Sequence, residues 1–136
     1  MSNKKTRHDV RRLAMQILYQ IDMTSNDRRE DILSTLDQEH DSLEICQQAV
    51  DLALAVWADR EKADQSITAL AEGWPTHRQP PVDRAILRLG FYEITSDRVA
   101  AAIAIDEAVE LAKKYCGKKS PPFINGVLDK IGRIKI

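Results

Sequence analysis

The chain has few cysteines, which could cross-link a small fold, and few of the glycine and proline residues that interrupt helices. Its 136 residues include two cysteines, five glycines and five prolines, and aromatic residues make up only 5%. Cys46 and Cys116 lie far apart without metal-ligand spacing, so we expect both to be reduced thiols. A chain of this length buries enough surface to fold without disulfides or a metal. Scarce helix breakers beside plentiful Ala, Leu and charged residues favour helices over strands.

Long apolar runs are also missing. The longest of them, residues 99–105, is far too short to cross a bilayer. The first twelve residues are polar and basic, and they lack the apolar core of a secretion signal. We therefore expect a soluble, cytoplasmic protein that makes no membrane contact.

Signatures of catalysis are absent as well. The sequence contains no GxSxG, P-loop or GxGxxG pattern. Its three histidines, His8, His40 and His77, lie apart in polar surroundings without metal-ligand spacing. Most of the carboxylates lie on helix faces that we expect to be exposed. We expect no enzyme activity, no metal and no cofactor.

What the sequence does have is a segregated charge. The net charge is only −1, yet residues 1–12 hold five basic residues against one acidic residue, and residues 112–136 hold seven against one. The acids gather between these ends, with twelve acidic and four basic residues in 22–64. If the two basic ends meet in the folded chain, they form a single positive surface that attracts phosphate groups.

Apolar residues recur at helical spacing along most of the chain, and no segment alternates at the period of a strand. The spacing predicts helices over 9–23, around 32–36, over 42–60, near 61–72, from Pro81 onward, near 101–116 and from Ser120 onward. Asp9, Ser42 and Ser120 are the expected N-caps, while Leu43 and Ile103 are among the side chains expected to face inward. Residues 73–81, with three prolines, form the clearest break. The prediction is an all-α fold of about six or seven helices in bundles.

The basic start carries a stripe of cations. Arg7 and Arg11 are four residues apart, as are His8 and Arg12, so each pair lies along one side of a helix. Such a stripe can follow a phosphate backbone, and arginine also stacks on unpaired bases or hydrogen-bonds to them. The alternative is a frayed, solvated helix start that binds nothing.

The start of the last helix adds a second basic element. Lys118 and Lys119 precede it, and the free backbone N–H groups of a helix start favour anions. Gly126 costs the helix about 1 kcal/mol relative to Ala, which indicates close approach by either a neighbouring helix or a bound nucleotide. Phe123 is most simply a core residue, and Trp74 a lid on the core rather than a platform for base stacking.

Four longer strings resemble a known family. They are RRLAMQILYQ (11–20), VDRAILRLGFYEI (82–94), AIAIDEAVELAKKY (102–115) and FINGVLDKI (123–131). Their content and order closely resemble the NusB family of transcription antitermination proteins, over nearly the whole chain. The resemblance implies two small helical bundles joined through the first helix. It also implies a single RNA-binding domain over 1–136, in which the basic segment 1–12 can be mobile.

The resemblance also implies a function and a set of contact residues. Members of this family bind boxA-type single-stranded RNA together with NusE, a small-subunit ribosomal protein, and act on the transcription elongation complex, chiefly on ribosomal RNA operons. The residues that would contact RNA are Lys5, Arg7, His8, Arg11, Arg12, Lys118, Lys119, Phe123 and Asn125. The NusE-facing region falls on Asp83 and Arg88, although Arg88 could instead pair with Asp83 or Asp97. His8 and Asp9 interrupt the family's arginine run, which predicts weaker or more partner-dependent RNA binding.

Two other interpretations stay open. An all-helical adaptor could bind only proteins, or form a homodimer, because interface residues and core residues look alike in one sequence. A ribosome-assembly module could bind RNA through the same basic ends without a role in transcription.

Overall fold

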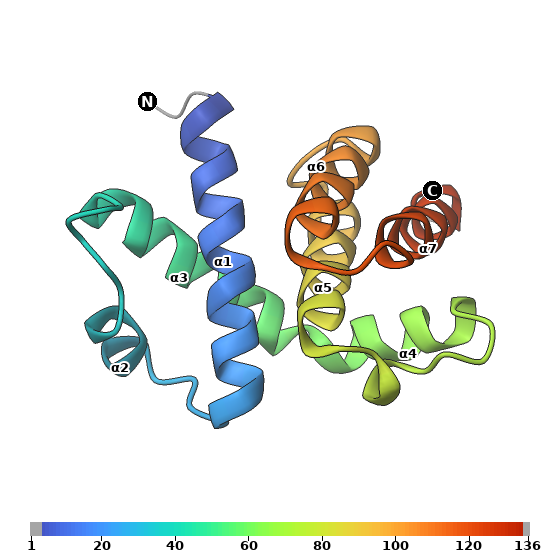
Figure 1. Ribbon diagram of the computed structural model, residues 1–136, viewed down its shortest axis with the longest axis horizontal. Coiled ribbons are helices and arrows are strands. Elements are labelled where there is room, and N and C mark those ends of the chain that lie inside the picture. Colours follow the sequence, from blue (N-terminus) through green and yellow to red (C-terminus); the bar gives the residue numbers. More distant parts are fainter. Residues whose placement is uncertain (1–3, 135–136) are drawn as a thin grey trace. The chain divides into compact units, whose positions relative to one another are not determined.

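The computed structural model describes residues 4–134, and for Lys4 and Lys5 it describes the backbone only. The described residues form seven α-helices, one 3₁₀ turn and no strand, which confirms the predicted all-α class (Figure 1). The chain divides into two compact units, unit 1 over Met1–Ala58 and unit 2 over Asp59–Ile136.

Unit 1 consists of α1 (Lys4–Thr24), α2 (Arg29–Ser34) and α3 (Leu43–Ala58), and the two long helices α1 and α3 pack against each other. The apolar positions predicted for the first helix are all buried, namely Val10, Ala14, Ile17, Leu18 and Ile21. Ser42 caps α3 as predicted, because its Oγ accepts the Ile45 N–H at 3.2 Å.

The first helix begins earlier than predicted. It starts at Lys4, so Asp9 lies within it and is not its N-cap. The residues ahead of Asp9 include no proline or glycine, and lysine and arginine favour helix, so nothing local stops the helix there. Residues 4–12, expected as a mobile start, are helical, while residues 1–3 lie outside the described part. Arg7, His8, Arg11 and Arg12 therefore lie on a regular helix.

Unit 2 consists of α4 (Arg60–Leu70), the 3₁₀ turn η1 (Thr76–Arg78), α5 (Pro81–Thr95), α6 (Ala101–Tyr115) and α7 (Ser120–Ile134). Helices α5, α6 and α7 all contact one another, and α4 packs against α5 and α7. Pro81 begins α5 as predicted, and Asp83 lies in the first turn, where the helix dipole favours an anion. Lys113 and Lys114 occupy the last turn of α6, which is the predicted complement to its dipole.

Gly90 marks a close contact between helices. A Cβ added there would lie 2.7 Å from Cδ1 of Leu128, whose side chain is fully buried, so α5 and α7 meet at this point. A Cβ added at Gly126 would meet nothing within 4 Å. The prediction that Gly126 accommodates a neighbouring helix is therefore wrong, and the alternative, approach by a bound nucleotide, stays a prediction.

Two side chains expected inside are exposed. Leu43 and Ile103 are 51% and 52% accessible, and both lie in the first turn of their helices, α3 and α6. Periodicity assigns a side chain to a helix face, but it does not say how far the neighbouring helix extends to cover that face. Across residues 4–134, no helix combines the length and the apolar character needed to span a membrane.

Candidate nucleic-acid interface

The predicted RNA-binding residues of α1 differ in accessibility. Arg7 and His8 are exposed, Arg12 is half-buried, and Arg11 is only 6% accessible. The side chain of Lys5 lies outside the described part. The basic stripe is therefore open to solvent at its first turn and becomes part of the protein interior one turn later.

Arg12 is engaged within unit 1. Its Nη2 lies 2.8 Å from Oδ1 of Asp41, and its Nη1 donates to Oε1 of Gln16 at 3.2 Å. The Asp41 side chain is 9% accessible and that of Arg12 is 16%, so the pair is shielded from water and salt. Burial and the nearby charge of Asp41 raise the pKa of the Cys46 thiol, while Arg12 acts in the opposite direction. Arg12 thus fastens α1 to the connection between α2 and α3.

In unit 2, the basic element lies on a loop and is exposed. Residues 117–119, here called the basic loop, join α6 to α7, and Lys118 and Lys119 both face solvent. Asn125 and Gly126, on α7, are exposed as well. The predicted RNA contacts of unit 2 are accessible on this loop and helix.

Phe123 has a clear packing partner. Its ring centroid lies 4.5 Å from that of Trp74, with 62° between the planes, which is an edge-to-face contact. Both side chains are half-buried. The contact supports the packing roles predicted for both rings, and RNA contact by Phe123 stays a prediction.

Asp83, predicted to face a partner protein, lies in the interior of unit 2. It is 2% accessible, and its carboxylate acts on the Cys116 thiol beside the start of α7. Burial first, and then the charge of Asp83, raise the pKa of the Cys116 thiol to about 12. Among the described residues, nothing donates a hydrogen bond to Asp83 Oδ2. Asp83 therefore holds the start of α5 against the residues that flank the basic loop.

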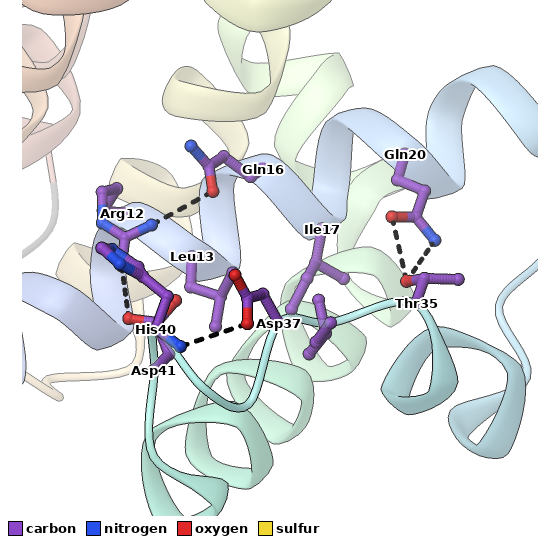
Figure 2. A pocket seen from close by; sticks show the side chains of 10 residues that line it. Arg12, Leu13, Gln16, Ile17, Gln20, Thr35, Asp37, His40 and Asp41 are labelled. Atoms are coloured by element: carbon purple, nitrogen blue, oxygen red, sulfur yellow. Dashed lines mark hydrogen bonds and ion pairs between the residues drawn. The ribbon is translucent and has the colours of Figure 1, made fainter.

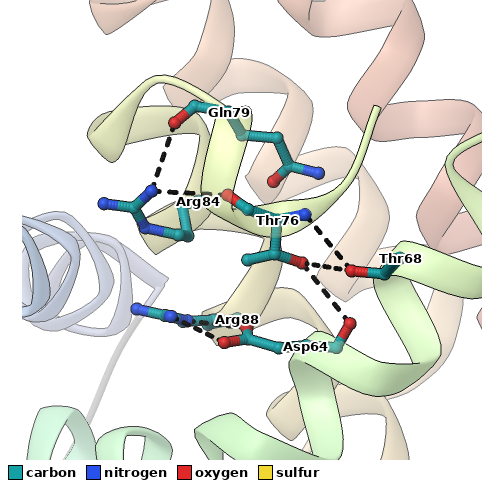
Figure 3. Close-up of polar contacts among 6 residues, drawn as sticks. All are labelled: Asp64, Thr68, Thr76, Gln79, Arg84 and Arg88. Carbon is teal, nitrogen blue, oxygen red and sulfur yellow. Dashed lines mark hydrogen bonds and ion pairs between the residues drawn. The ribbon is translucent and has the colours of Figure 1, made fainter. Parts of the chain in front are cut away.

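Arg88 is also held inside unit 2 (Figure 3). Its Nε and Nη2 lie 2.9 and 2.7 Å from the two carboxylate oxygens of Asp64 on α4, and its side chain is 8% accessible. This two-pronged geometry is the strong form of an Arg–carboxylate contact. The partner in this contact is 24 residues away in sequence and lies on α4, not on the helix of Arg88.

The same polar network fixes η1. The Thr76 N–H donates to Oγ1 of Thr68 at 3.2 Å, and Arg84 donates to the carbonyls of Thr76 and Gln79 at 3.3 and 3.2 Å (Figure 3). The proline-rich break is thereby tied to both α4 and α5. The prediction that Asp83 and Arg88 contact NusE stays a prediction, and the geometry gives both side chains a role in the packing of unit 2.

Two further expectations bear on the interface. Among the described residues, no group of three or more His, Cys, Asp or Glu side chains could hold a metal ion. The expectation that the two basic ends make one positive surface concerns the placement of unit 1 against unit 2, and it stays a prediction.

Comparison with known sequences identifies close relatives. The model of the NusB family matches residues 8–133. The chain is 42% identical to transcription antitermination protein NusB of Saccharopolyspora erythraea over 130 residues, which cover 94% of this chain and 87% of the relative. It is 37% identical to the same protein of Acetivibrio thermocellus over 131 residues, which cover 96% of this chain and 90% of the relative.

Solved structures share the fold. T. maritima NusB superposes with a TM-score of 0.81 at 28% identity, covering 98% of this chain and 93% of that one. A structure of antitermination factors NusB and NusE in complex with double-stranded RNA gives a TM-score of 0.82 at 24% identity, covering 97% and 99%, and this likeness is one of fold. Together with the family match, the long alignments show that the chain belongs to the NusB family.

Proposed function

We propose that this chain is a transcription antitermination factor that binds boxA-type single-stranded RNA together with NusE. The observation that carries the proposal is the near-full-length likeness to relatives named transcription antitermination protein NusB, at 37 and 42% identity. A NusB of the same fold has been solved with NusE and double-stranded RNA, which supports RNA and NusE as classes of partner. The proposed activity is binding, on the elongation complex in the cytoplasm, and it requires no catalytic group.

The exposed basic side chains support the RNA part of the proposal. Lys118 and Lys119 face solvent beside the start of α7, and Arg7 and His8 face solvent on α1. Phosphate contacts of such side chains supply most of the affinity for a nucleic acid and position the strand. Arg11 is buried and Arg12 pairs with Asp41, so we expect these two residues to contribute less to RNA affinity than the exposed ones. The full proposed set remains Lys5, Arg7, His8, Arg11, Arg12, Lys118, Lys119, Phe123 and Asn125.

A binding experiment tests the proposal. Fluorescence anisotropy of a labelled boxA-like RNA is measured with the chain alone, with NusE alone and with both, beside a scrambled RNA of equal length and composition. We expect the pair to bind boxA more tightly than either protein does, because an RNA held by one protein meets the contacts of the other at a raised effective concentration. Absence of RNA binding under all three conditions contradicts the proposal. Binding to NusE without RNA binding identifies the protein-only adaptor.

A functional measurement separates the remaining alternative. In a reconstituted transcription reaction on a template with boxA ahead of a terminator, we expect the chain and NusE to raise read-through. A template with mutated boxA is the matched control. RNA binding without any change in read-through identifies the ribosome-assembly module.

A further inference from the structure

A polar pocket lies within unit 1, between α1 and the connection from α2 to α3 (Figure 2). Its volume is about 270 Å³. Leu13, Ile17 and Leu36 give it an apolar lining, while amide, hydroxyl, carboxylate and imidazole side chains supply the polar part. This mixture of an apolar surface and a few polar groups is typical of small-molecule sites.

The frame of the pocket is fixed by contacts of the fold. Asp37 Oδ1 accepts the backbone N–H groups of Glu39 and His40 at 3.0 and 3.1 Å, and the Asp41 N–H donates to the Asp37 carbonyl at 3.0 Å. The pair of Arg12 and Asp41 then fastens this turn to α1. A ligand therefore enters a pocket whose walls are already ordered, which lowers the entropic cost of binding.

One side of α1 connects the basic start to this pocket. His8, Arg12, Gln16 and Gln20 follow one another at intervals of four residues, so they lie along one side of the helix. His8 is exposed near the basic start, and the other three line the pocket. Each interval advances about 6 Å along the helix axis. A strand bound at the first turn of α1 thus has a polar path along the helix to the pocket.

We propose that the pocket holds one unstacked base of single-stranded RNA, an inference that rests on the proposed RNA-binding function. The pocket is slightly smaller than those that take drug-sized ligands, which fits a single base. Single-stranded RNA is commonly recognised through bases turned out of the stack, which stack on His or Arg and hydrogen-bond through their edges. Both kinds of contact are available here, stacking from His40 and a hydrogen bond from the amide of Gln16, whereas the Gln20 amide contacts the Thr35 hydroxyl.

The polar groups match the edge of a base. Gln16 Oε1 accepts from Arg12, so the amide NH₂ is the part of Gln16 left for a ligand (Figure 2). With Oδ1 of Asp37 engaged by the backbone, Oδ2 is the oxygen able to accept from a ligand. A carboxylate accepts from an exocyclic amino group and repels phosphate. The donor of Gln16 and the acceptor of Asp37 therefore suit the edge of a base, which carries an acceptor beside an N–H donor, rather than a phosphate group.

The test uses boxA-like RNAs in which one nucleotide at a time is abasic. Binding is measured by anisotropy in the presence of NusE for the wild-type chain, Asp37→Asn and Gln16→Ala. Asp37→Asn keeps the Oδ1 acceptor that shapes the turn, so the pocket stays folded. Glu39→Gln is the matched control, because it removes the same charge from the same exposed turn at a residue that does not line the pocket. Thermal melting followed by circular dichroism verifies that all variants fold alike.

We expect one abasic position to weaken wild-type binding about tenfold, as loss of a stacked base does. In Asp37→Asn and Gln16→Ala the same abasic position costs less than about twofold, whereas Glu39→Gln behaves like the wild type. Equal losses at all positions, or an abasic penalty unchanged in both pocket variants, overturn the inference, and salt-dependent binding of the intact RNA then leaves the proposed function standing. Absence of any RNA binding overturns both.

Discussion

The two units carry the same sequence signal, basic residues clustered by a helix start, but the fold uses them differently. In unit 1, Arg12 pairs with Asp41 and Arg11 is buried. In unit 2, Lys118 and Lys119 lie on a loop and are exposed. A helix that packs along its length draws some of its cations into contacts of the fold, whereas a surface loop does not. Charge counted along the sequence therefore overstates the charge that unit 1 offers to RNA.

The largest expected effect is a loss of folding stability when Arg12 is replaced. Replacing Arg12 by Ala leaves the shielded Asp41 carboxylate without its partner, and we expect the free energy of unfolding to fall by about 2–3 kcal/mol. Urea denaturation followed by circular dichroism measures this change. Lys118→Ala is the control in the other unit and should stay within about 0.5 kcal/mol of the wild type. Equal stabilities of the two variants would erase the contrast between the units.

A second prediction concerns the cations of the basic loop. Replacing both Lys118 and Lys119 by Ala removes up to two phosphate contacts, and we expect RNA affinity to fall about tenfold at moderate salt. The slope of log association constant against log salt should become about 1.4 less negative. Lys130→Ala with Lys62→Ala, both at exposed positions, is a matched control for net charge. An equal loss in that control would show that overall charge, not the basic loop, governs binding.

A smaller effect is expected at Gly126. Because a Cβ there meets nothing and the residue lies within α7, Gly126→Ala should stabilise the chain by up to about 1 kcal/mol. If RNA approaches this surface closely, the same variant binds RNA less tightly while melting at a higher temperature. Gly90→Ala should instead destabilise the chain, since its Cβ would press on buried Leu128. Unchanged RNA affinity of Gly126→Ala would remove the bound-nucleotide interpretation of this glycine.

The smallest expected effect is a slow alkylation of the two cysteine thiols in the folded chain. The pKa of Cys116 is raised to about 12, so its thiol keeps its proton in the folded chain above the pH, near 8.5, at which an unfolded cysteine loses it. Its contribution to stability is thus complete below that pH and is lost as the pH rises toward about 12. Alkylation mapped by mass spectrometry should be slow at pH 9 for both Cys46 and Cys116, and fast after denaturation. Rapid native alkylation of Cys116 at pH 9 would contradict the raised pKa.

Local signals predicted most of the fold. The apolar period located the helices, Ser42 and Pro81 marked two of their starts, and residues 73–81 marked the main break. The prediction from Asp9 was wrong because a good capping residue does not mark the start of a helix when the residues before it also favour helix. The prediction from Gly126 was wrong because a glycine in a helix shows only that no side chain is present there, and it does not show that another helix lies close by.

The contacts of the candidate interface were harder to predict. Arg12 and Asp41 are 29 residues apart, and Arg88 and Asp64 are 24 apart, so their pairing depends on which helices pack together. Burial of Asp83 beside Cys116 arises in the same way. Family resemblance named the contact residues, but only the packed structure distinguishes those that face solvent from those that hold the fold.

The most direct test of RNA binding through exposed cations is the salt dependence of association with single-stranded boxA-like RNA in the presence of NusE. Contacts with about five phosphates give a log–log slope near −3.5, and loss of the two basic-loop lysines should bring it to about −2. A slope near zero for the wild-type chain would contradict the account, because no phosphate would then be neutralised by the protein.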